Sequence, residues 1–277
     1  MKRACVIGWP VEHSRSPVIH RYWLNRYGIA GAYEKEAVPP GEAAEFIRSL
    51  AERGYVGANV TLPHKVTALE VADVTDAASR AIGAANTLWF DAEGRLCAGN
   101  SDAYGFMTNL TEQAPHWAGR PGPVAVLGAG GAARAILYGL IESGAETVKL
   151  ANRSRVRAED LAQAFGPKVE VVAWEDRNGM LAGCGLFVNA TSLGMTGEEP
   201  LEIDLAELPA DAVVADIVYS PLETKLLAAA RARGNLAVDG LGMLLHQAIP
   251  GFERWFGVRP EVTPELEAHV AATLEET

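Results

Sequence analysis

The sequence predicts an α/β protein made of two α/β domains, each a layer of strands covered by helices. Two observations carry this prediction. Short apolar runs alternate with helical patterns in the first hundred residues, beginning with a strand at 3–8 and a helix that ends near Arg26. Further along, residues 124–135 join a short apolar strand to a helix through a glycine-dense turn. The length of 277 residues suits two domains of modest size.

Composition narrows the classes of function. Hydrophobic residues make up 49% of the chain and charged residues 21%, as in soluble globular proteins with a large core. The formal net charge of −11 argues against nucleic acid or an anionic membrane as a partner. Cys5, Cys97 and Cys184 lack metal-ligand spacing, which indicates a reducing compartment and no metal site. With no signal or membrane segment in the pattern, a cytoplasmic protein is expected.

The elements of the first half are expected in a regular order. After the strand at 3–8 and its helix come a strand at 33–38, a helix at 41–53, a strand through Asn59, a hairpin with its turn at 91–94, and a helix at 103–112. Pro17 and Pro63 each suit the first position of a helix, and Pro63 also ends the strand before it.

The serines before the first helix have two interpretations. Ser16 precedes a proline, which favours an extended conformation, and the plain interpretation is that it caps the helix. Alternatively, Ser14 and Ser16 lie two apart in an extended segment, so both hydroxyls face a carboxylate above the helix start.

Polar residues gather at the end of the strand that carries Asn59. Asn59 and Thr61 share one face of that strand, and Lys65 follows in the first helical turn. An ammonium is unfavourable at a helix N-terminus, which makes Lys65 a candidate proton donor. His64 points away from these residues and is expected to be a surface or packing histidine.

Asp102 also has two interpretations. Its place before the helix at 103–112 is typical of an N-cap. As a catalytic group it would pair with Lys65, orienting the lysine and stabilising its charged form.

The glycine-dense turn predicts a dinucleotide site. Gly128, Gly130 and Ala133 fit the pattern G-x-G-x-x-G/A between a strand at 124–127 and a helix at 132–142. This is the Rossmann-type arrangement, in which a pyrophosphate rests on free N–H groups at the helix start. The residues expected around it are Gly128, Ala129, Gly130, Gly131 and Ala132.

A strand follows at 146–151 and a helix is expected at 158–165, and the residues between them indicate which dinucleotide is bound. An NAD site carries an acidic residue here for the ribose 2′-hydroxyl, and this chain has none. Arg153 and Arg157 instead offer guanidinium groups to a 2′-phosphate, with Asn152 and Ser154 as neutral hydrogen-bond partners. The cofactor expected is therefore NADP.

Taken together, the motifs resemble the shikimate dehydrogenase family from end to end. They are H-S-R-S-P from 13, N-V-T-L-P-H-K from 59, A-N-T from 85, G-N-S-D from 99, G-A-G-G-A-A-R from 128, N-R-S from 152, N-A-T-S-L-G-M from 189, D-I-V-Y from 216 and G-L-G-M-L-L-H-Q-A from 240. The resemblance implies reversible NADPH-dependent reduction of 3-dehydroshikimate to shikimate, on the route to aromatic amino acids.

The resemblance also implies residue roles. Lys65 and Asp102 would be the catalytic pair, and Ser14 and Ser16 would hold the substrate carboxylate. The residues expected to hold the carboxylate or the ring hydroxyls are Asn59, Thr61, Asn86, Tyr219 and Gln247. Further cofactor contacts are expected from Thr191, Ile217 and Gly240.

The domain plan implied by the resemblance is a substrate domain at 1–103 plus 242–277 and a cofactor domain at 104–241, with a cleft that closes over both ligands. Further strands at 169–174, 186–190 and 213–218 and a helix at 224–233 agree with it. Gln247 is expected inside the first tail helix, which Pro250 should kink or end.

Alternatives remain open at this point. One is a dehydrogenase that also oxidises quinate, and another is a regulator that binds NADP and a shikimate-like acid without turnover. Lys65 and Asp102 together argue against a pure binder. A folate-linked dehydrogenase of similar plan should not need Ser14 and Ser16. A monomer and a homodimer are both possible.

Overall fold

The computed structural model describes residues 1–275 and divides into two compact units. Unit 1 contains Met1–Asp102 and Leu245–Ala272. Unit 2 contains Ala103–Leu244 and the segment that starts at Thr273. Each unit has its own six-stranded sheet, so the expected α/β class with two sheets is confirmed.

The sheet of unit 1 is mixed, with strand order β2-β1-β3-β5-β6-β4. Its strands are β1 (Lys2–Gly8), β2 (Gly31–Ala37), β3 (Tyr55–Val60), β4 (Val74–Thr75), β5 (Thr87–Phe90) and β6 (Leu96–Gly99). β1 pairs in parallel with β2 and β3, whereas β5 runs antiparallel to β3 and β6. The expected hairpin is therefore confirmed as β5 and β6.

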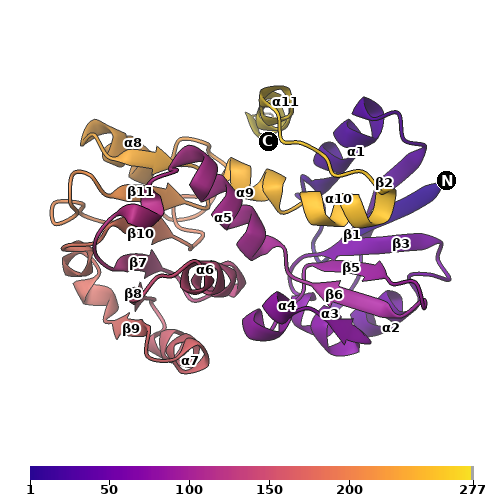
Figure 1. Ribbon diagram of the computed structural model, residues 1–277, viewed down its shortest axis with the longest axis horizontal. Coiled ribbons are helices and arrows are strands. Elements are labelled where there is room, and N and C mark those ends of the chain that lie inside the picture. Colours follow the sequence, from indigo (N-terminus) through magenta and orange to yellow (C-terminus); the bar gives the residue numbers. More distant parts are fainter. Residues whose placement is uncertain (276–277) are drawn as a thin grey trace. The chain divides into compact units, whose positions relative to one another are not determined.

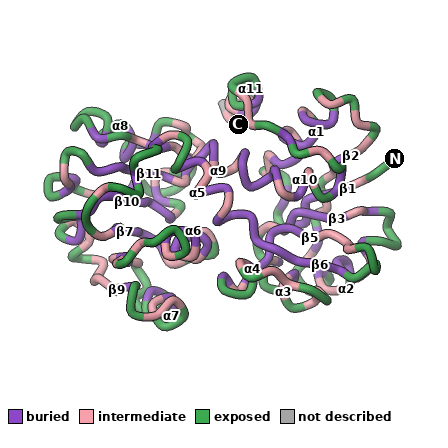
Figure 2. Tube along the Cα trace, viewed as in Figure 1, coloured by how far each residue is buried: buried purple, intermediate pink, exposed green. Residues whose placement is uncertain are grey.

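Helices cover this sheet and bury its core. They are α1 (Ser16–Arg26), α2 (Ala43–Arg48), α3 (Lys65–Val71), α4 (Ala77–Ile82) and α10 (Ile249–Phe256), with a 3-10 turn η1 at Pro40–Glu42. The last helix, α11 (Pro264–Glu275), lies against α1, where the His269 and Tyr22 ring centroids are 5.4 Å apart. Trp255 of α10 donates its indole N–H to the Leu88 carbonyl of β5 at 2.9 Å, which ties the tail of the chain to the sheet. Figure 2 shows the central strands of the sheet as buried.

The sheet of unit 2 is wholly parallel, with order β12-β11-β10-β7-β8-β9 (Figure 1). Its strands are β7 (Val124–Leu127), β8 (Val148–Ala151), β9 (Val169–Val172), β10 (Leu186–Asn189), β11 (Val213–Asp216) and β12 (Leu236–Val238). This is the Rossmann order, in which the chain reverses direction across the sheet between β7 and β10. Ligands bind at the carboxyl ends of strands beside such a switch point.

Helices connect the strands of unit 2 and pack on both faces. They are α6 (Gly131–Glu142), α7 (Arg155–Phe165) and α8 (Lys225–Ala232), with most of α5 (Asp102–Gln113) and of α9 (Leu241–His246), and the 3-10 turns η2 (Trp117–Gly119), η3 (Trp174–Asp176) and η4 (Gly179–Leu181). One apolar cluster includes Ile136 of α6 and Val126 of β7, and a second includes Phe187 of β10. The sheet is therefore buried on both sides, as parallel sheets are.

Two expected helix boundaries were wrong. The helix expected at 41–53 ends at Arg48, because the Ser49 hydroxyl donates to the Phe46 carbonyl and competes with the helical hydrogen bonds. The helix expected from 158 begins at Arg155, whose side chain pairs with Glu159 at 2.8 Å and supports an extra first turn.

The tail also differs from the expectation. α9 ends at His246, and Gln247 lies in the turn before α10 rather than inside a helix. Pro250 has no N–H to donate to the His246 carbonyl, so the helix ends and a new one starts with the proline in its first turn. The expected break at Pro250 is confirmed, while the helical placement of Gln247 was wrong.

Candidate functional site

The polar centre of unit 1 is a hydrogen-bonded group of Lys65, Asp102 and Asn86. Lys65 Nζ donates to Asp102 Oδ2 at 2.5 Å, and Asn86 Nδ2 donates to Asp102 Oδ1 at 2.8 Å. The side chains of Lys65 and Asp102 are 21% and 12% exposed, so solvent screens this ion pair only in part. An ammonium has three N–H donors, so Lys65 can bind Asp102 and still offer a proton to a substrate oxygen.

The start of α5 places Asp102 inside the helix, not in the capping position. Asn100 Oδ1 accepts a hydrogen bond from the Asp102 N–H at 2.9 Å. Asp102 is itself the first residue of α5, so its interpretation as the N-cap was wrong. Asn86 is held in turn, since its Oδ1 accepts from the Ser101 N–H at 2.8 Å.

Lys65 opens α3, two residues later than Pro63 was expected to start the helix. A turn closed by the His64 N–H and the Thr61 carbonyl, at 3.0 Å, occupies these positions, and its Leu62–Pro63 peptide is cis. The His64 side chain is buried, with Nε2 2.7 Å from the Val38 carbonyl oxygen. His64 is thus a packing histidine, as expected.

Asn59 joins this centre to a buried aromatic cluster. Its Nδ2 donates to the Asn86 carbonyl at 3.3 Å, while its Oδ1 accepts from Tyr33 Oη at 2.6 Å and lies 3.2 Å from His20 Nε2. The His20 ring stacks on Tyr33 with centroids 4.0 Å apart. Complete burial lowers the pKa of His20 to about 3, so the ring is neutral and donates from Nε2.

His20 and Tyr33 were not found from the sequence. The only local signal was the helical face on which His20 lies, and nothing local indicates that Asn59 accepts from both side chains.

The structure places Ser14 just before α1 and Ser16 as the first residue of that helix. Arg15 is already in the α conformation, so the segment is not extended, and Ser14 Oγ accepts from the Ser16 N–H at 3.3 Å. Arg15 is the N-cap residue of α1 and no side chain makes a capping bond there, so the interpretation of Ser16 as the cap was wrong. The Ser16 side chain is buried and its hydroxyl contacts Tyr33, which links it to Asn59. Thr61 extends the β3 path, with its N–H on the Ile7 carbonyl at 2.8 Å.

The glycine-dense turn of unit 2 has the shape that a phosphate needs. Gly128 follows β7 at φ +110°, and a Cβ there would lie 2.7 Å from the Ala190 carbonyl oxygen. By contrast, a Cβ on Gly130 or Gly131 would meet no atom within 4 Å. No side chain of the described chain caps the start of α6, so its N–H groups remain available to an anion.

The end of β8 presents basic and neutral donors to solvent. Arg153 and Arg157 are exposed, and Arg153 Nη1 lies 3.6 Å from Glu199 Oε2, both side chains being largely in water. Asn152 Nδ2 donates to the Ser154 carbonyl at 2.8 Å, which shapes the turn into α7. Arg153 holds a weak carboxylate partner at the position where a 2′-phosphate is expected.

The ends of β10 and β11 carry the remaining residues of unit 2. Thr191 follows β10, and Ile217 and Tyr219 follow β11. Gly240 packs directly on the Ile217 carbonyl, because a Cβ at Gly240 would overlap that oxygen. Between these segments lie the buried polar side chains of Asn189 and Asp216. Both belong to motifs quoted from the sequence, but no role was predicted for either.

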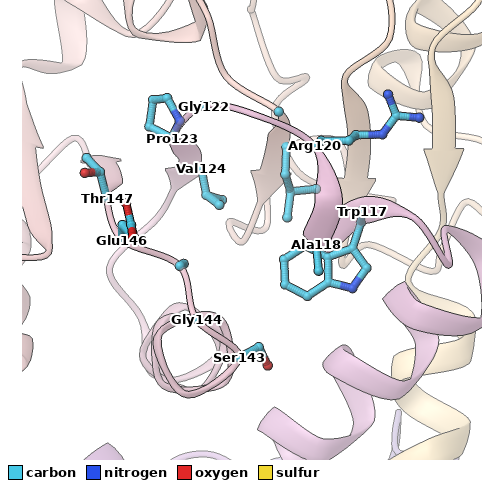
Figure 3. Close-up of a pocket in the computed structure, with 13 residues that line it drawn as sticks. Trp117, Ala118, Arg120, Gly122, Pro123, Val124, Ser143, Gly144, Glu146 and Thr147 are labelled. Atoms are coloured by element: carbon cyan, nitrogen blue, oxygen red, sulfur yellow. The ribbon is translucent and has the colours of Figure 1, made fainter.

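A pocket in unit 2 is remote from the glycine-dense turn. It has a volume of about 470 Å³ and is lined by residues that precede or open strands, including Thr147, Val124 and Leu186 (Figure 3). Trp117 and Ser143 also line it. Because all strands here are parallel, this pocket lies at the edge opposite to the carboxyl ends. It is therefore not the expected cofactor site.

Two further observations concern metal ions and membrane spans. Among the described residues, no group of three or more His, Cys, Asp or Glu side chains is arranged to hold a metal ion. None of the helices formed by residues 1–275 is long and apolar enough to cross a membrane.

Comparison with protein families matches three segments of the chain. Residues 6–88 match the shikimate dehydrogenase substrate binding domain, residues 118–220 match shikimate / quinate 5-dehydrogenase, and residues 240–264 match the shikimate 5′-dehydrogenase C-terminal domain. The shikimate dehydrogenase (NADP(+)) of Rhodopseudomonas palustris strain TIE-1 is 57% identical over 273 residues, which cover 99% of this chain and 97% of that protein.

Solved structures agree in fold. The quinate dehydrogenase of Corynebacterium glutamicum in complex with NAD has a TM-score of 0.90 and 29% identity, covering 98% of this chain and 99% of that one. The shikimate 5-dehydrogenase of Thermus thermophilus in complex with NADP(H) and shikimate has a TM-score of 0.84 and 36% identity, covering 99% of this chain and 100% of that one.

Proposed function

Because the chain belongs to the shikimate dehydrogenase family, we propose that it catalyses the reversible NADP-dependent reduction of 3-dehydroshikimate to shikimate. The observation that carries the proposal is the Lys65–Asp102 pair of unit 1, whose Nζ and Oδ2 atoms are 2.5 Å apart and whose carboxylate is held by Asn86. Lys65 and Asn86 lie in the segment that matches the substrate binding domain. A protein that only bound these ligands would need no acid–base pair of this kind.

The chain supplies the proton for this reaction. When bound, NADPH provides the hydride that reaches the ketone carbon. Lys65 Nζ then gives a proton to the developing alkoxide oxygen, and it takes that proton back in the direction of shikimate oxidation. Asp102 keeps the ammonium oriented and stabilises its charged form, while Asn86 fixes the other carboxylate oxygen.

Residues around this pair are proposed to hold the substrate. Ser14 and Ser16, at the start of α1, take the carboxylate, supported by the helix N-terminus behind them. The ring hydroxyls and the carboxylate are shared among Asn59, Thr61, Asn86, Tyr219 and Gln247. Asn59 Oδ1 already accepts from Tyr33 and lies against His20 Nε2, so its contribution to substrate is through Nδ2 or through the placement of Asn86.

Unit 2 is proposed to hold NADP. The open space above Gly130 and Gly131 and the uncapped start of α6 fit a pyrophosphate, with Gly128, Ala129 and Ala132 beside them. Arg153 and Arg157, with Asn152 and Ser154, take the 2′-phosphate. Thr191, Ile217 and Gly240 contact the rest of the cofactor.

The remaining assignments are part of the same proposal. Residues 1–103 plus 242–277 form the substrate domain and residues 104–241 the cofactor domain, and the protein works in the cytoplasm as a monomer or a homodimer. Size-exclusion chromatography with light scattering decides between the last two.

The experiment is a steady-state assay of NADPH formation with purified wild type and Lys65→Ala. We expect the variant to lose about two to four orders of magnitude in kcat with a smaller change in KM, because the proton donor acts mainly in the transition state. Lys2→Ala removes an exposed lysine of the same unit and is the matched control. Near-normal turnover by Lys65→Ala removes Lys65 from the chemistry.

A second candidate, a dual shikimate and quinate dehydrogenase, is favoured by the match of residues 118–220 to shikimate / quinate 5-dehydrogenase. Offering shikimate and quinate, each with NADP and with NAD, separates the two. Turnover limited to shikimate with NADP supports the first proposal, and comparable quinate turnover supports the second. No turnover in any of the four pairs favours a non-catalytic binder.

A further inference from the structure

Two buried polar side chains stand side by side at the carboxyl edge of the unit 2 sheet. Asn189 ends β10 and Asp216 ends β11, and the parallel register pairs them as direct neighbours. They are 0% and 2% exposed. Asn189 Nδ2 donates to Asp216 Oδ1 at 2.9 Å, so the last residues of two adjacent strands are joined through their side chains.

Asn189 shapes the segment after β10. Its Oδ1 accepts from both the N–H and the hydroxyl of Thr191, at 3.2 and 2.7 Å. Its Nδ2 donates a second time, to the Leu193 carbonyl at 3.2 Å. One amide side chain thereby holds residues 191–193 in a turn, and the position of Thr191 depends on it.

Asp216 shapes the segment after β11 in the same way. Its Oδ1 accepts from the Val218 N–H at 3.1 Å, and its Oδ2 accepts from the Thr224 hydroxyl at 2.7 Å. Thr224 in turn caps α8 by accepting from the Leu227 N–H at 3.2 Å. The chain from Ile217 to Tyr219 is thus held between the strand end and the helix start.

A buried carboxylate at this position costs free energy of folding, whereas an apolar residue there would not. No cation forms an ion pair with Asp216 within the described part of the chain, and burial raises the pKa of its carboxyl group. The hydrogen bonds from Asn189, Val218 and Thr224 offset that cost. An apolar residue would pack between the same strands, but it would accept none of these bonds and would leave both segments without an anchor.

We propose that Asn189 and Asp216 act as one positioning unit, which sets the cofactor-contacting segment at Thr191 and the segment of Ile217 and Tyr219 in a fixed relation. The inference rests on the proposed function, because the ligand roles of these three residues come from it. Neither Asn189 nor Asp216 touches the reacting atoms. Each acts through the residues it holds, so disturbing one should affect cofactor and substrate together.

The test compares Asp216→Ala, Asn189→Ala, the double variant and the near-isosteric Asp216→Asn. Asn235→Ala is the matched control, because Asn235 is also a buried amide that ties loops together, donating to the carbonyls of Pro209, Ala210 and Ala212 at the opposite end of β11. Measurements are thermal unfolding, the dissociation constant of NADP⁺ by calorimetry, and kcat and KM for shikimate, all at a temperature well below every unfolding midpoint.

We expect Asp216→Ala to lower kcat/KM for shikimate by about 10- to 100-fold and to weaken NADP⁺ binding by about 3- to 10-fold, as for lost hydrogen bonds to a buried charged group. Asp216→Asn retains an acceptor for Asn189 and Val218 and should recover most of both losses. The double variant should be no worse than the worse single variant, because the two residues act as a unit. Asn235→Ala should lower the unfolding midpoint without changing either ligand parameter.

Other outcomes overturn the inference. If Asp216→Ala is destabilised like Asn235→Ala but keeps wild-type ligand parameters, the network serves stability only. If the two single losses simply add, the residues are not one unit. If the wild type is inactive with shikimate and NADP, the proposed function is wrong. The positioning role can still be tested in that case, because an unchanged NADP⁺ dissociation constant in Asp216→Ala overturns it. A wild type that binds no NADP⁺ removes both.

Discussion

Protonation of His20 should make the stability of unit 1 depend on pH in a way that one substitution abolishes. The imidazole is completely buried between Tyr33, Trp23 and Trp255, and its burial lowers its pKa from 6.5 to about 3. In the unfolded chain the ring is in water and takes a proton near pH 6.5. At a pH between these two values, His20 binds a proton in the unfolded chain but not in the folded protein.

This difference in proton binding sets the sign and the size of the pH effect on the free energy of unfolding. His20 contributes no penalty above pH 6.5, and its contribution to the free energy of unfolding falls as the pH drops from 6.5 towards 3. Each pH unit in this window costs about 1.4 kcal/mol, so we expect a loss of roughly 3 kcal/mol between pH 7 and pH 4.5 from this residue.

His20→Phe retains a flat ring on Tyr33 but cannot bind a proton. It also removes the donor at 3.2 Å from Asn59 Oδ1, which still accepts from Tyr33, and this should cost about 1 kcal/mol at every pH. The variant should therefore be less stable than wild type at pH 7 and more stable at pH 4.5. The two stability curves should cross near pH 5 to 6.

Urea unfolding followed by tryptophan fluorescence at half-unit steps of pH checks this, since Trp23 and Trp255 lie against the His20 ring. His116→Gln is the matched control, because it removes an exposed imidazole, and it should leave the wild-type pH profile unchanged. Parallel curves for wild type and His20→Phe across the whole range would refute the reasoning, since the folded state would then accept the proton.

Two further changes test other parts of the molecule. Arg153→Ala should raise KM for NADP⁺ by about tenfold or more while leaving KM for NAD⁺ nearly unchanged, because a guanidinium recognises the 2′-phosphate that NAD⁺ lacks. Equal losses with both cofactors in the same steady-state assay would contradict the assignment of Arg153 to the 2′-phosphate. Gly57→Ala should destabilise the protein by about 2 kcal/mol or more in urea unfolding, because a Cβ at Gly57 would overlap Trp255 Nε1 and the Leu88 carbonyl. A wild-type unfolding midpoint in this variant would show that the contact is not tight.

Local patterns were enough for much of the fold. The strand at 124–127, the glycine turn after it and the hairpin turn at 91–94 were all predictable, because each depends on the conformational range of a few adjacent residues. Pro250 was equally informative, since a proline beyond the first turn removes a helical hydrogen bond, so the preceding helix ends before it. Short elements such as β4 and β12 were missed, because two or three residues make no periodic pattern.

Capping residues were the weakest part of the sequence interpretation. Ser16 and Asp102, the expected caps, are each the first residue of a helix, and their N–H groups are bonded by Ser14 and Asn100, two positions earlier. Each pair lies within two residues, and every member can accept a backbone N–H, so composition does not separate them. The choice depends on which side chain is already engaged elsewhere in the fold.

The sequence by itself determined which residues could carry chemistry and in which order the longer strands and helices occur, because residue type and periodicity are local properties. Only the tertiary structure decided which of those residues meet. Lys65 and Asp102 are 37 positions apart and touch because each is the first residue of a helix beside the same sheet edge. Asn189 and Asp216 are 27 apart and touch because β10 and β11 pair in parallel. Strand register and helix starts are set by packing across the whole unit, and no stretch of neighbouring residues contains that information.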